Sequence, residues 1–192
     1  MLTSLWTHIP GLKVVCPSSP YDAKGLLIQA IRDNDPVIFC EHKALYSMKG
    51  EVPEGEYVIP FGQANIVREG KDATIVTYGM MVHRSLEAAK LLEKEGVDVE
   101  VIDLRTLSPL DINTVFQSVE KTGRLVVVDE ASPRCNIATD ISAQVCQEMF
   151  GKLKSGIRMV SPPHTPVPFS APLEKAYLPN GKGIAETVRQ TL

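Results

Sequence analysis

The sequence predicts an open, doubly wound α/β domain that is preceded by the last βαβ portion of a second α/β domain. Short apolar runs alternate with segments of helical period along most of the chain, and prolines and glycines interrupt both patterns between residues 50 and 62. The length of 192 residues is about one and a third times a typical domain of roughly 150 residues. We therefore expect a domain remnant at residues 1–50, a linker at 51–67 and a complete domain at 68–192.

The first fifty residues predict one βαβ unit. The apolar run 12–16 is stopped by Pro17, which is typical of a buried strand, and Ser18 or Ser19 can cap a helix that has Pro20 in its first turn. The apolar run 37–40 is the returning strand. A crossover of this length predicts parallel pairing and a right-handed connection.

The second part of the chain begins with irregular sequence and then alternates strands with helices. Residues 43–68 predict an extended linker with a short strand near 57–59. The apolar strand 124–129 predicts a position covered on both faces of the sheet. The other expected elements are strand 73–78, helix 82–95, strand 97–103, a helix from 108–111 to Gly123, helix 137–150, strand 157–160 and, after a proline-rich segment, a last helix with Ile184, Val188 and Leu192 at four-residue spacing.

Composition and charge exclude several classes of protein. With 44% hydrophobic and 22% charged residues the chain has the composition of a folded globular protein, and a net charge of −3 argues against a nucleic-acid binder. No apolar run approaches the roughly 20 residues that span a bilayer, and residues 1–10 do not resemble a secretory signal. The four cysteines form no C-x-x-C pair, so we expect reduced thiols, mostly in or near the core, and a cytoplasmic protein.

Common catalytic motifs are absent, which leaves polar residues that follow strands as the candidates. The sequence contains no G-x-G-x-x-G, P-loop, H-E-x-x-H or G-x-S-x-G motif. Glu41 and Glu130 follow predicted strands, where α/β sheets place ligands, although such carboxylates also order loops. Arg105 and Arg134 follow strands as well, and they can bind an anion or pair with Asp103, Asp129 or Glu130.

Each of the four histidines is expected to have a structural role. His8 can line a pocket at the edge of the first unit, and His42 follows a strand end. His83 lies at the start of a helix, where it is expected to be solvated or to cap. His164 lies in the proline-rich segment.

The end of the first helix is a weak candidate for a cation site. Residues 30–36 combine the free carbonyl groups of a helix C-terminus with Asp33, Asp35 and the helix-terminating Pro36. Converging oxygen atoms suit a hard cation, but many helix ends have the same pattern.

Several runs together resemble one family. The beta subunits of thiamine-diphosphate-dependent 2-oxo acid dehydrogenases have runs similar to 8–15, 22–27, 30–38, 41–46, 101–111 and 164–168 of this chain. Within that family the sequence is most similar to the acetoin dehydrogenase branch. The resemblance implies a pyrimidine-binding domain, of which residues 1–50 are the end, followed by a transketolase-type C-terminal domain.

The resemblance implies that this chain carries no catalytic and no cofactor-binding residue. The family's aminopyrimidine-contacting glutamate and its active-site histidine correspond to positions before residue 1, and His8 matches a position that is not catalytic. The cofactor, thiamine diphosphate with magnesium, would be bound only in the intact enzyme, and this chain alone is expected to be inactive.

The same resemblance implies a potassium site and a set of partners. Backbone oxygens matching Ala30, Ile31, Asp33 and Asp35 hold a structural potassium ion in the family, together with one ligand upstream of this chain. The implied partners are an alpha subunit and a second beta subunit in an α2β2 tetramer, and the dihydrolipoyl acetyltransferase core. His164, which stands where many members have an acidic residue, and Leu192 match the docking region for that core.

Other functions remain open at this stage. The leading expectation is acetoin cleavage with acetyl transfer to lipoamide, in which this chain serves assembly and docking. A pyruvate or branched-chain 2-oxo acid dehydrogenase beta subunit is the alternative within the family. A non-catalytic dimerisation and docking module is a second class, and a flavodoxin-like ligand binder would need a phosphate-binding loop that the sequence does not show.

Overall fold

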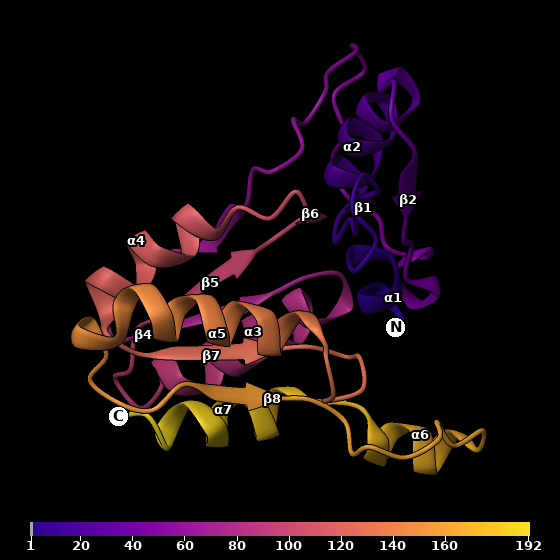
Figure 1. Cartoon of the computed structure of the whole chain (residues 1–192). Helices are drawn as coiled ribbons and strands as arrows, with labels where there is room; N and C mark the ends of the chain where they lie inside the picture. Colours follow the sequence, from indigo (N-terminus) through magenta and orange to yellow (C-terminus); the bar gives the residue numbers. More distant parts are fainter. Residues whose placement is uncertain (1) are drawn as a thin grey trace.

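Two β-sheets organise residues 2–192, the part of the chain that the computed structural model describes (Figure 1). The smaller sheet has the strand order β2-β1-β6 and the larger has the order β3-β5-β4-β7-β8. The strands are β1 (Lys13–Val15), β2 (Val37–Phe39), β3 (Asn65–Arg68), β4 (Ala73–Thr77), β5 (Val99–Asp103), β6 (Thr106–Ser108), β7 (Leu125–Val128) and β8 (Arg158–Val160). The helices are α1 (Thr3–Thr7), α2 (Pro20–Arg32), η1 (Lys43–Leu45), α3 (Met80–Glu93), α4 (Ile112–Thr122), α5 (Ile137–Met149), η2 (Phe150–Lys152), α6 (Ala171–Tyr177) and α7 (Gly181–Arg189).

The first unit contains the βαβ arrangement that its sequence predicts. β1 and β2 are parallel, with Lys13 opposite Val37. Between them α2 begins with Pro20 at its first turn, and the Ser19 side chain accepts a hydrogen bond from the Asp22 backbone N–H. A short helix, α1, precedes β1 and was not expected.

The second domain contributes an unexpected strand to the first unit. Residues 106–108 were predicted to lead into a helix, but they form β6, which pairs antiparallel with β1. The Ser108 hydroxyl also donates a hydrogen bond to the Leu12 carbonyl at 2.9 Å. The following helix, α4, therefore begins later than predicted, at Ile112, with the Asp111 side chain as its cap.

The linker differs from the prediction in two places, residues 57–59 and residues 65–68. Residues 57–59 do not form a strand, because this segment packs along α2: Tyr57 stacks on Tyr21 with ring centroids 4.6 Å apart, and the Ile59 N–H bonds to the Gly25 carbonyl. The strand lies further on, where residues 65–68 form β3 and pair antiparallel with β5. The end of the predicted linker 51–67 therefore belongs to the second sheet.

The second domain is doubly wound, as predicted. β5, β4, β7 and β8 are parallel, and β7 is buried along its whole length between β4 and β8. One face of the sheet packs on α3 and α7 through a core that includes Leu92 and Ile184, and the other packs on α4 and α5 through a core that includes Val119 and Ile141.

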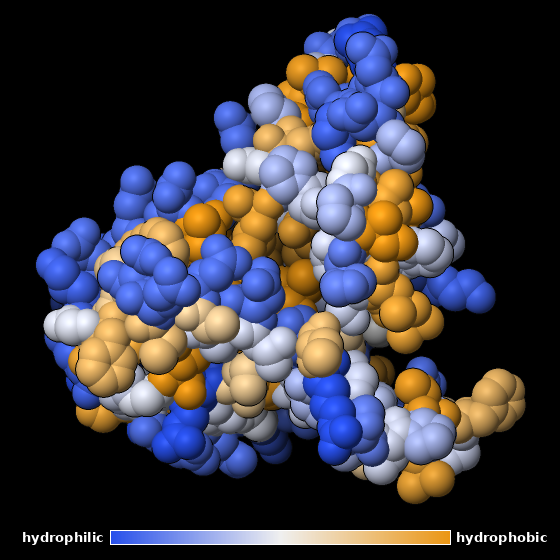
Figure 2. Space-filling model, in the orientation of Figure 1, coloured by the Kyte–Doolittle hydropathy of each residue, from blue (hydrophilic) through white to orange (hydrophobic). Residues whose placement is uncertain are grey.

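The proline-rich segment forms a projection with an apolar tip. It contains α6, which was not expected, and it extends away from the sheet at the lower right of Figure 1. Val167, Phe169 and Leu173 are exposed there, and Figure 2 shows apolar surface at this tip and along the right-hand side of the first unit. The exposed apolar residues of the first unit include Leu5, Ile9, Leu27 and Ile31.

The positions of the cysteines confirm only part of the prediction. Cys16 is buried and Cys40 is half-buried. Cys135 and Cys146 are exposed, so the expectation that most thiols lie in or near the core is wrong for these two. On α5 the core positions are taken by Ile141 and Val145, which leaves Cys146 on the solvent side. Among residues 2–192 no helix has the length and apolar character needed to cross a membrane.

Candidate functional site

The first unit sits on the edge of the large sheet at which the parallel strands end. Tyr78 follows β4, Asp103 is the last residue of β5 and Asp129 follows β7, and all three side chains are buried. In open α/β sheets this carboxyl-terminal edge is the usual place for polar functional groups. Here it is covered by α1 and by the loop between β1 and α2. We call this contact region between the two units the junction.

Asp103 is the central carboxylate of the junction. It accepts a hydrogen bond from the Ser18 hydroxyl and another, at 3.0 Å, from the backbone N–H of Arg105. Burial raises the pKa of Asp103 to about 7, and the Ser18 and Arg105 hydrogen bonds only partly oppose this. The group therefore titrates close to neutral pH.

A buried ion pair joins the two units beside Asp103. The Arg105 Nη2 atom lies 2.7 Å from Asp22 Oδ1, and the two side chains are 14% and 5% exposed. Arg105 has a φ angle of 58°, a left-handed conformation that is uncommon for a residue with a side chain. The sequence offered Asp103, Asp129 and Glu130 as partners for this arginine; the observed partner is on α2 instead.

A second chain of hydrogen bonds crosses the junction at Tyr78. Its hydroxyl donates to Asp129 Oδ1 at 2.6 Å, and the hydroxyl of Thr3 lies 3.0 Å from the same oxygen of Tyr78. Burial, together with the nearby Asp129 carboxylate, raises the pKa of Tyr78 well above its ordinary value. The N-terminal helix α1 is thus connected to the end of β7.

The predicted candidate Glu130 pairs with a histidine of the first unit. The His42 Nε2 atom lies 3.1 Å from Glu130 Oε1, while the His42 Nδ1 atom accepts from the Ala44 N–H at the start of η1. His83 also contacts the first unit, because its Nε2 atom lies 2.8 Å from the Ser18 carbonyl oxygen. The expectation that His83 is solvated or caps its helix is therefore wrong.

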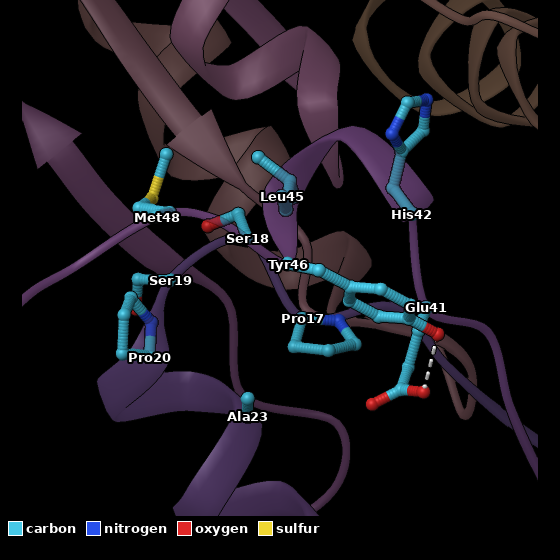
Figure 3. Close-up of a pocket in the computed structure, with 10 residues that line it drawn as sticks. All are labelled: Pro17, Ser18, Ser19, Pro20, Ala23, Glu41, His42, Leu45, Tyr46 and Met48. Atoms are coloured by element: carbon cyan, nitrogen blue, oxygen red, sulfur yellow. Dashed lines mark hydrogen bonds between the residues drawn. The ribbon is translucent and has the colours of Figure 1, made fainter.

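An open pocket of about 320 Å³ lies at the edge of the junction (Figure 3). Glu41 and Tyr46 are joined there by a 3.0 Å hydrogen bond from the tyrosine hydroxyl, and the side chains of Glu41 and His42 point in opposite directions. Its lining is largely apolar and consists of Pro17, Ser18, Ser19, Pro20, Ala23, Glu41, His42, Leu45, Tyr46 and Met48. The two predicted glutamates thus lie on either side of His42, with Glu41 in the pocket and Glu130 in the junction.

A larger hollow, of about 670 Å³, lies between α1, the loop after β6 and the start of α5. His8 and Arg134 both line it, so His8 does border a pocket as the sequence suggested. Arg134 thus lines this hollow, whereas Arg105 pairs with Asp22 in the junction.

The residues of the predicted cation site lie at and just after the end of α2. The Ala30 carbonyl accepts a hydrogen bond from the Asp33 N–H at 3.4 Å, and α2 ends at Arg32. Lys13 lies against both carboxylates, with its Nζ atom 2.6 Å from Asp33 and 3.0 Å from Asp35. The carboxylate charges are thus compensated within the protein, so backbone oxygens would have to supply the main contacts to a cation.

The two predicted docking residues lie near opposite ends of β7. His164 Nδ1 lies 2.7 Å from the Ser132 hydroxyl, beyond the carboxyl end of β7. The Leu192 carbonyl accepts a hydrogen bond from Arg124, just before the other end of the same strand. Within one chain they therefore do not form a single patch.

No cluster of three or more His, Cys, Asp or Glu side chains among residues 2–192 has the spacing to hold a metal ion. The buried carboxylates of the junction already contact donors of this chain: Asp22 pairs with Arg105, Asp103 bonds to Ser18 and Asp129 bonds to Tyr78.

Sequence reasoning missed most of the contacts that build the junction. Ser18, Asp22 and Tyr78 were considered only as parts of local elements, and their partners are between 51 and 85 positions away in hydrogen bonds such as Tyr78–Asp129 and Ser18–Asp103. Polar residues directly after buried strands were the available signal, and that signal did identify Glu41 and Glu130.

Comparisons with known proteins match both parts of the chain. The family model of the transketolase C-terminal domain matches residues 62–184, and the model of the transketolase pyrimidine-binding domain matches residues 1–49. A solved structure described as a split-gene transketolase, inactive beta4 tetramer, superposes with a TM-score of 0.82 at 26% identity, covering 99% of this chain and 61% of that one.

Curated relatives are similar along the whole chain. It is 74% identical over 192 residues to the beta subunit of acetoin:2,6-dichlorophenolindophenol oxidoreductase from Cupriavidus necator, and 54% identical to the subunit of the same name from Bacillus subtilis. It is 53% identical to the beta subunit of the pyruvate dehydrogenase E1 component from Bacillus subtilis. The chain spans 57%, 56% and 59% of these relatives, respectively.

Proposed function

Because the chain belongs to the transketolase C-terminal domain family, we propose that it forms part of the beta subunit of a thiamine-diphosphate-dependent acetoin dehydrogenase. The observation that carries this proposal is the 74% identity over 192 residues to the acetoin:2,6-dichlorophenolindophenol oxidoreductase subunit of Cupriavidus necator. The two Bacillus subtilis relatives, an acetoin subunit and a pyruvate dehydrogenase subunit, are almost equally similar at 54% and 53%, so the substrate needs the experimental test below. The reaction would cleave acetoin oxidatively and transfer the acetyl group to lipoamide.

Within that enzyme, this chain would serve subunit assembly and partner docking. Its buried ionisable groups contact one another across the junction, which suits a rigid scaffold. The expected partners are the alpha subunit, a second beta subunit in an α2β2 tetramer, and the dihydrolipoyl acetyltransferase core. The relative named as a beta4 tetramer supports association through chains of this type. We also propose a cytoplasmic location, which suits the four free cysteines.

A graft tests the substrate assignment. The matching 57% of the Cupriavidus necator beta subunit is replaced by this chain, and the hybrid is combined with the alpha subunit of that organism. We expect acetoin-dependent reduction of 2,6-dichlorophenolindophenol within about tenfold of the parent enzyme.

The matched control is the same graft made with the corresponding segment of the Bacillus subtilis pyruvate dehydrogenase subunit. This control should assemble less well or turn over acetoin more slowly. Pyruvate-dependent or branched-chain 2-oxo acid-dependent dye reduction by the first hybrid, without acetoin turnover, would instead favour the alternative members of the family. A hybrid that assembles and turns over none of these substrates would favour a non-catalytic module.

We propose that thiamine diphosphate and magnesium are held outside this chain in the intact enzyme, which agrees with the pairing of the buried junction carboxylates with donors of the chain itself. We therefore propose that the 192 residues alone are inactive. The purified chain, alone or mixed with an alpha subunit, should give no thiamine-diphosphate-dependent dye reduction above the rate without protein. Acetoin-dependent reduction by that mixture would contradict the proposal.

We also propose a structural potassium ion at the end of α2, held by backbone oxygens of Ala30, Ile31, Asp33 and Asp35. Carbonyl oxygens at a helix C-terminus carry partial negative charge and suit a cation, and the Ala30 oxygen, which accepts from the Asp33 N–H, has a second lone pair available. The thermal midpoint of the chain should be higher in potassium chloride than in sodium or choline chloride at equal ionic strength. Equal midpoints in all three salts would exclude the site in this chain.

Docking to the acyltransferase core is assigned to His164 and Leu192. A pull-down with the peripheral subunit-binding domain of a dihydrolipoyl acetyltransferase should retain the chain, and His164→Ala or removal of Leu192 should weaken retention. Cys146→Ser, on the exposed side of α5, is the control and should bind like the wild type. Unchanged retention of both docking variants would show that the docking surface lies elsewhere.

A further inference from the structure

Two cysteines lie opposite each other at the ends of adjacent strands. The parallel register of β1 and β2 places Val15 opposite Phe39, and the N–H of the next residue, Cys40, donates to the Val15 carbonyl at 2.7 Å. One position further, Cys16 faces Cys40. Opposed residues of parallel strands point to the same side of a sheet and have Cα atoms roughly 5 Å apart, within the range that a disulfide spans.

The two thiols have different surroundings. Cys16 is fully buried in the core of the second domain's sheet, beside residues such as Leu104. Cys40 packs against the same core but is only half-buried. The interaction of the two thiols with each other is the largest cause of a raised pKa for Cys16 and a lowered pKa for Cys40. Cys40 is therefore the accessible and more readily ionised member, and Cys16 is the protected one.

We propose that Cys16 and Cys40 form a reversible redox pair that a hydroperoxide closes to an intrachain disulfide. The Cys40 thiolate attacks the terminal peroxide oxygen and breaks the O–O bond. It becomes a sulfenic acid, and hydroxide leaves from hydrogen peroxide, or an alkoxide from an organic hydroperoxide. The Cys16 thiol then attacks the Cys40 sulfur, forming the S–S bond and releasing water. Two thiols are oxidised and one peroxide is reduced. Two external thiols, or one dithiol, reverse the step by exchange and are themselves oxidised to a disulfide.

The two cysteines lie next to both the pocket and the junction, so a disulfide between them would affect both. Cys16 is followed by Pro17 and Ser18, and Cys40 by Glu41 and His42, so both strand ends continue directly into the wall of the pocket in Figure 3. Ser18 and His42 are also the residues that contact Asp103 and Glu130 across the junction. A covalent link at this point would join the two loops that hold the first unit on the second domain.

The test uses the full chain and hydrogen peroxide as the oxidant. Limited oxidation, alkylation of free thiols and peptide mapping without reduction should give one cross-linked species that joins the peptides of Cys16 and Cys40. Cys135 and Cys146 should be recovered mainly in alkylated form, and dithiothreitol should restore all four free thiols. In Cys16→Ser, Cys40 should stop at the sulfenic acid, which dimedone traps.

The double variant Cys135→Ser, Cys146→Ser is the matched control, because it leaves only the proposed pair and changes two exposed positions. It should form the same cross-link at the same rate. The proposal is overturned if the wild-type chain gives only disulfides that involve Cys135 or Cys146, or if Cys40 is oxidised to the sulfinic acid without a cross-link. Wild-type peptide mapping decides the question even if a Cys16 variant fails to fold.

Discussion

At the residue scale, the junction depends on a few buried groups whose charges are tied to contacts between the two units. Asp103 is fully buried, and its pKa is raised by that burial to about 7. The unfolded chain would ionise this carboxyl at the ordinary aspartate pKa near 4. Between these two values the folded state holds a proton that the unfolded state releases, so the stability that this proton confers is complete at low pH and is lost as pH rises through 7.

We predict that Asp103→Asn makes the protein less sensitive to pH. In the wild type, this group alone should lower the free energy of unfolding by about 1.4 kcal/mol per pH unit between pH 5 and 7. The amide cannot ionise, so the variant should be more stable than the wild type at pH 8. Urea unfolding at several pH values measures the slope. Asp140→Asn, an exposed change on α5, should keep the wild-type slope, and an equal slope in Asp103→Asn would refute the prediction.

A second prediction at this scale concerns the contribution of the ion pair between Asp22 and Arg105 to stability. Removing one partner leaves the other charge buried, so Asp22→Asn or Arg105→Met should each cost about 3–5 kcal/mol in the free energy of unfolding. The double variant should cost less than the sum of the two. The exposed pair of Arg189 and Glu95 serves as control, and Arg189→Met should cost less than about 1 kcal/mol. Additive losses in the junction would show that the two residues act independently.

At the element scale, the turn between β3 and β4 packs directly on β5. A Cβ atom at Gly70 would lie 2.2 Å from the backbone nitrogen of Glu100, which cannot move without disturbing the centre of the sheet. Glu100 is itself buried and pairs with Lys121 of α4. This turn therefore fixes how closely the antiparallel edge strand can approach the parallel strands.

We predict that Gly70→Ala destabilises the protein by more than about 3 kcal/mol, because backbone atoms must shift to admit the methyl group. Gly151→Ala is the matched control: a Cβ at Gly151 meets nothing within 4 Å and its φ angle is ordinary, so the free energy of unfolding should change by less than about 0.5 kcal/mol. Thermal and urea unfolding measure both. Equal stability of the two variants would mean that the turn can relax.

At the scale of the whole molecule, strand β6 connects the two units through backbone hydrogen bonds. It comes from the second domain and pairs with β1 of the first unit, and the ion pair of Asp22 with Arg105 lies next to it. The first unit has a core of only a few buried residues, Val15, Leu26 and Ile59. Such a unit gains its order from the domain on which it sits.

We predict that the two units unfold in a single transition. Trp6 is the sole tryptophan and lies on α1, so its fluorescence reports the first unit, whereas far-UV circular dichroism mainly reports the helices of the second domain. Urea titrations followed by both signals should give the same midpoint. An earlier fluorescence transition would show that the first unit separates before the second domain unfolds.

Local pattern in the sequence was enough to predict most of the elements and the doubly wound order of the second domain. Some signals depend only on residues a few positions away in the sequence, so they can be recognised without knowledge of the fold. They include apolar runs, helix caps such as Ser19 and helix terminators such as Gly123. The resemblance to one family carried the functional assignment, which composition and motifs alone left open.

Only the tertiary structure decided how the two parts meet. The pairing of β6 with β1, the edge strand β3, and the contacts of His42 with Glu130 and of Asp22 with Arg105 join residues that are distant in sequence. Short polar segments such as 106–108 have no periodicity that marks them as strands, and they become strands because a partner edge lies beside them. Burial of Asp103, and with it a pKa near neutrality, likewise exists only once the first unit covers the end of β5.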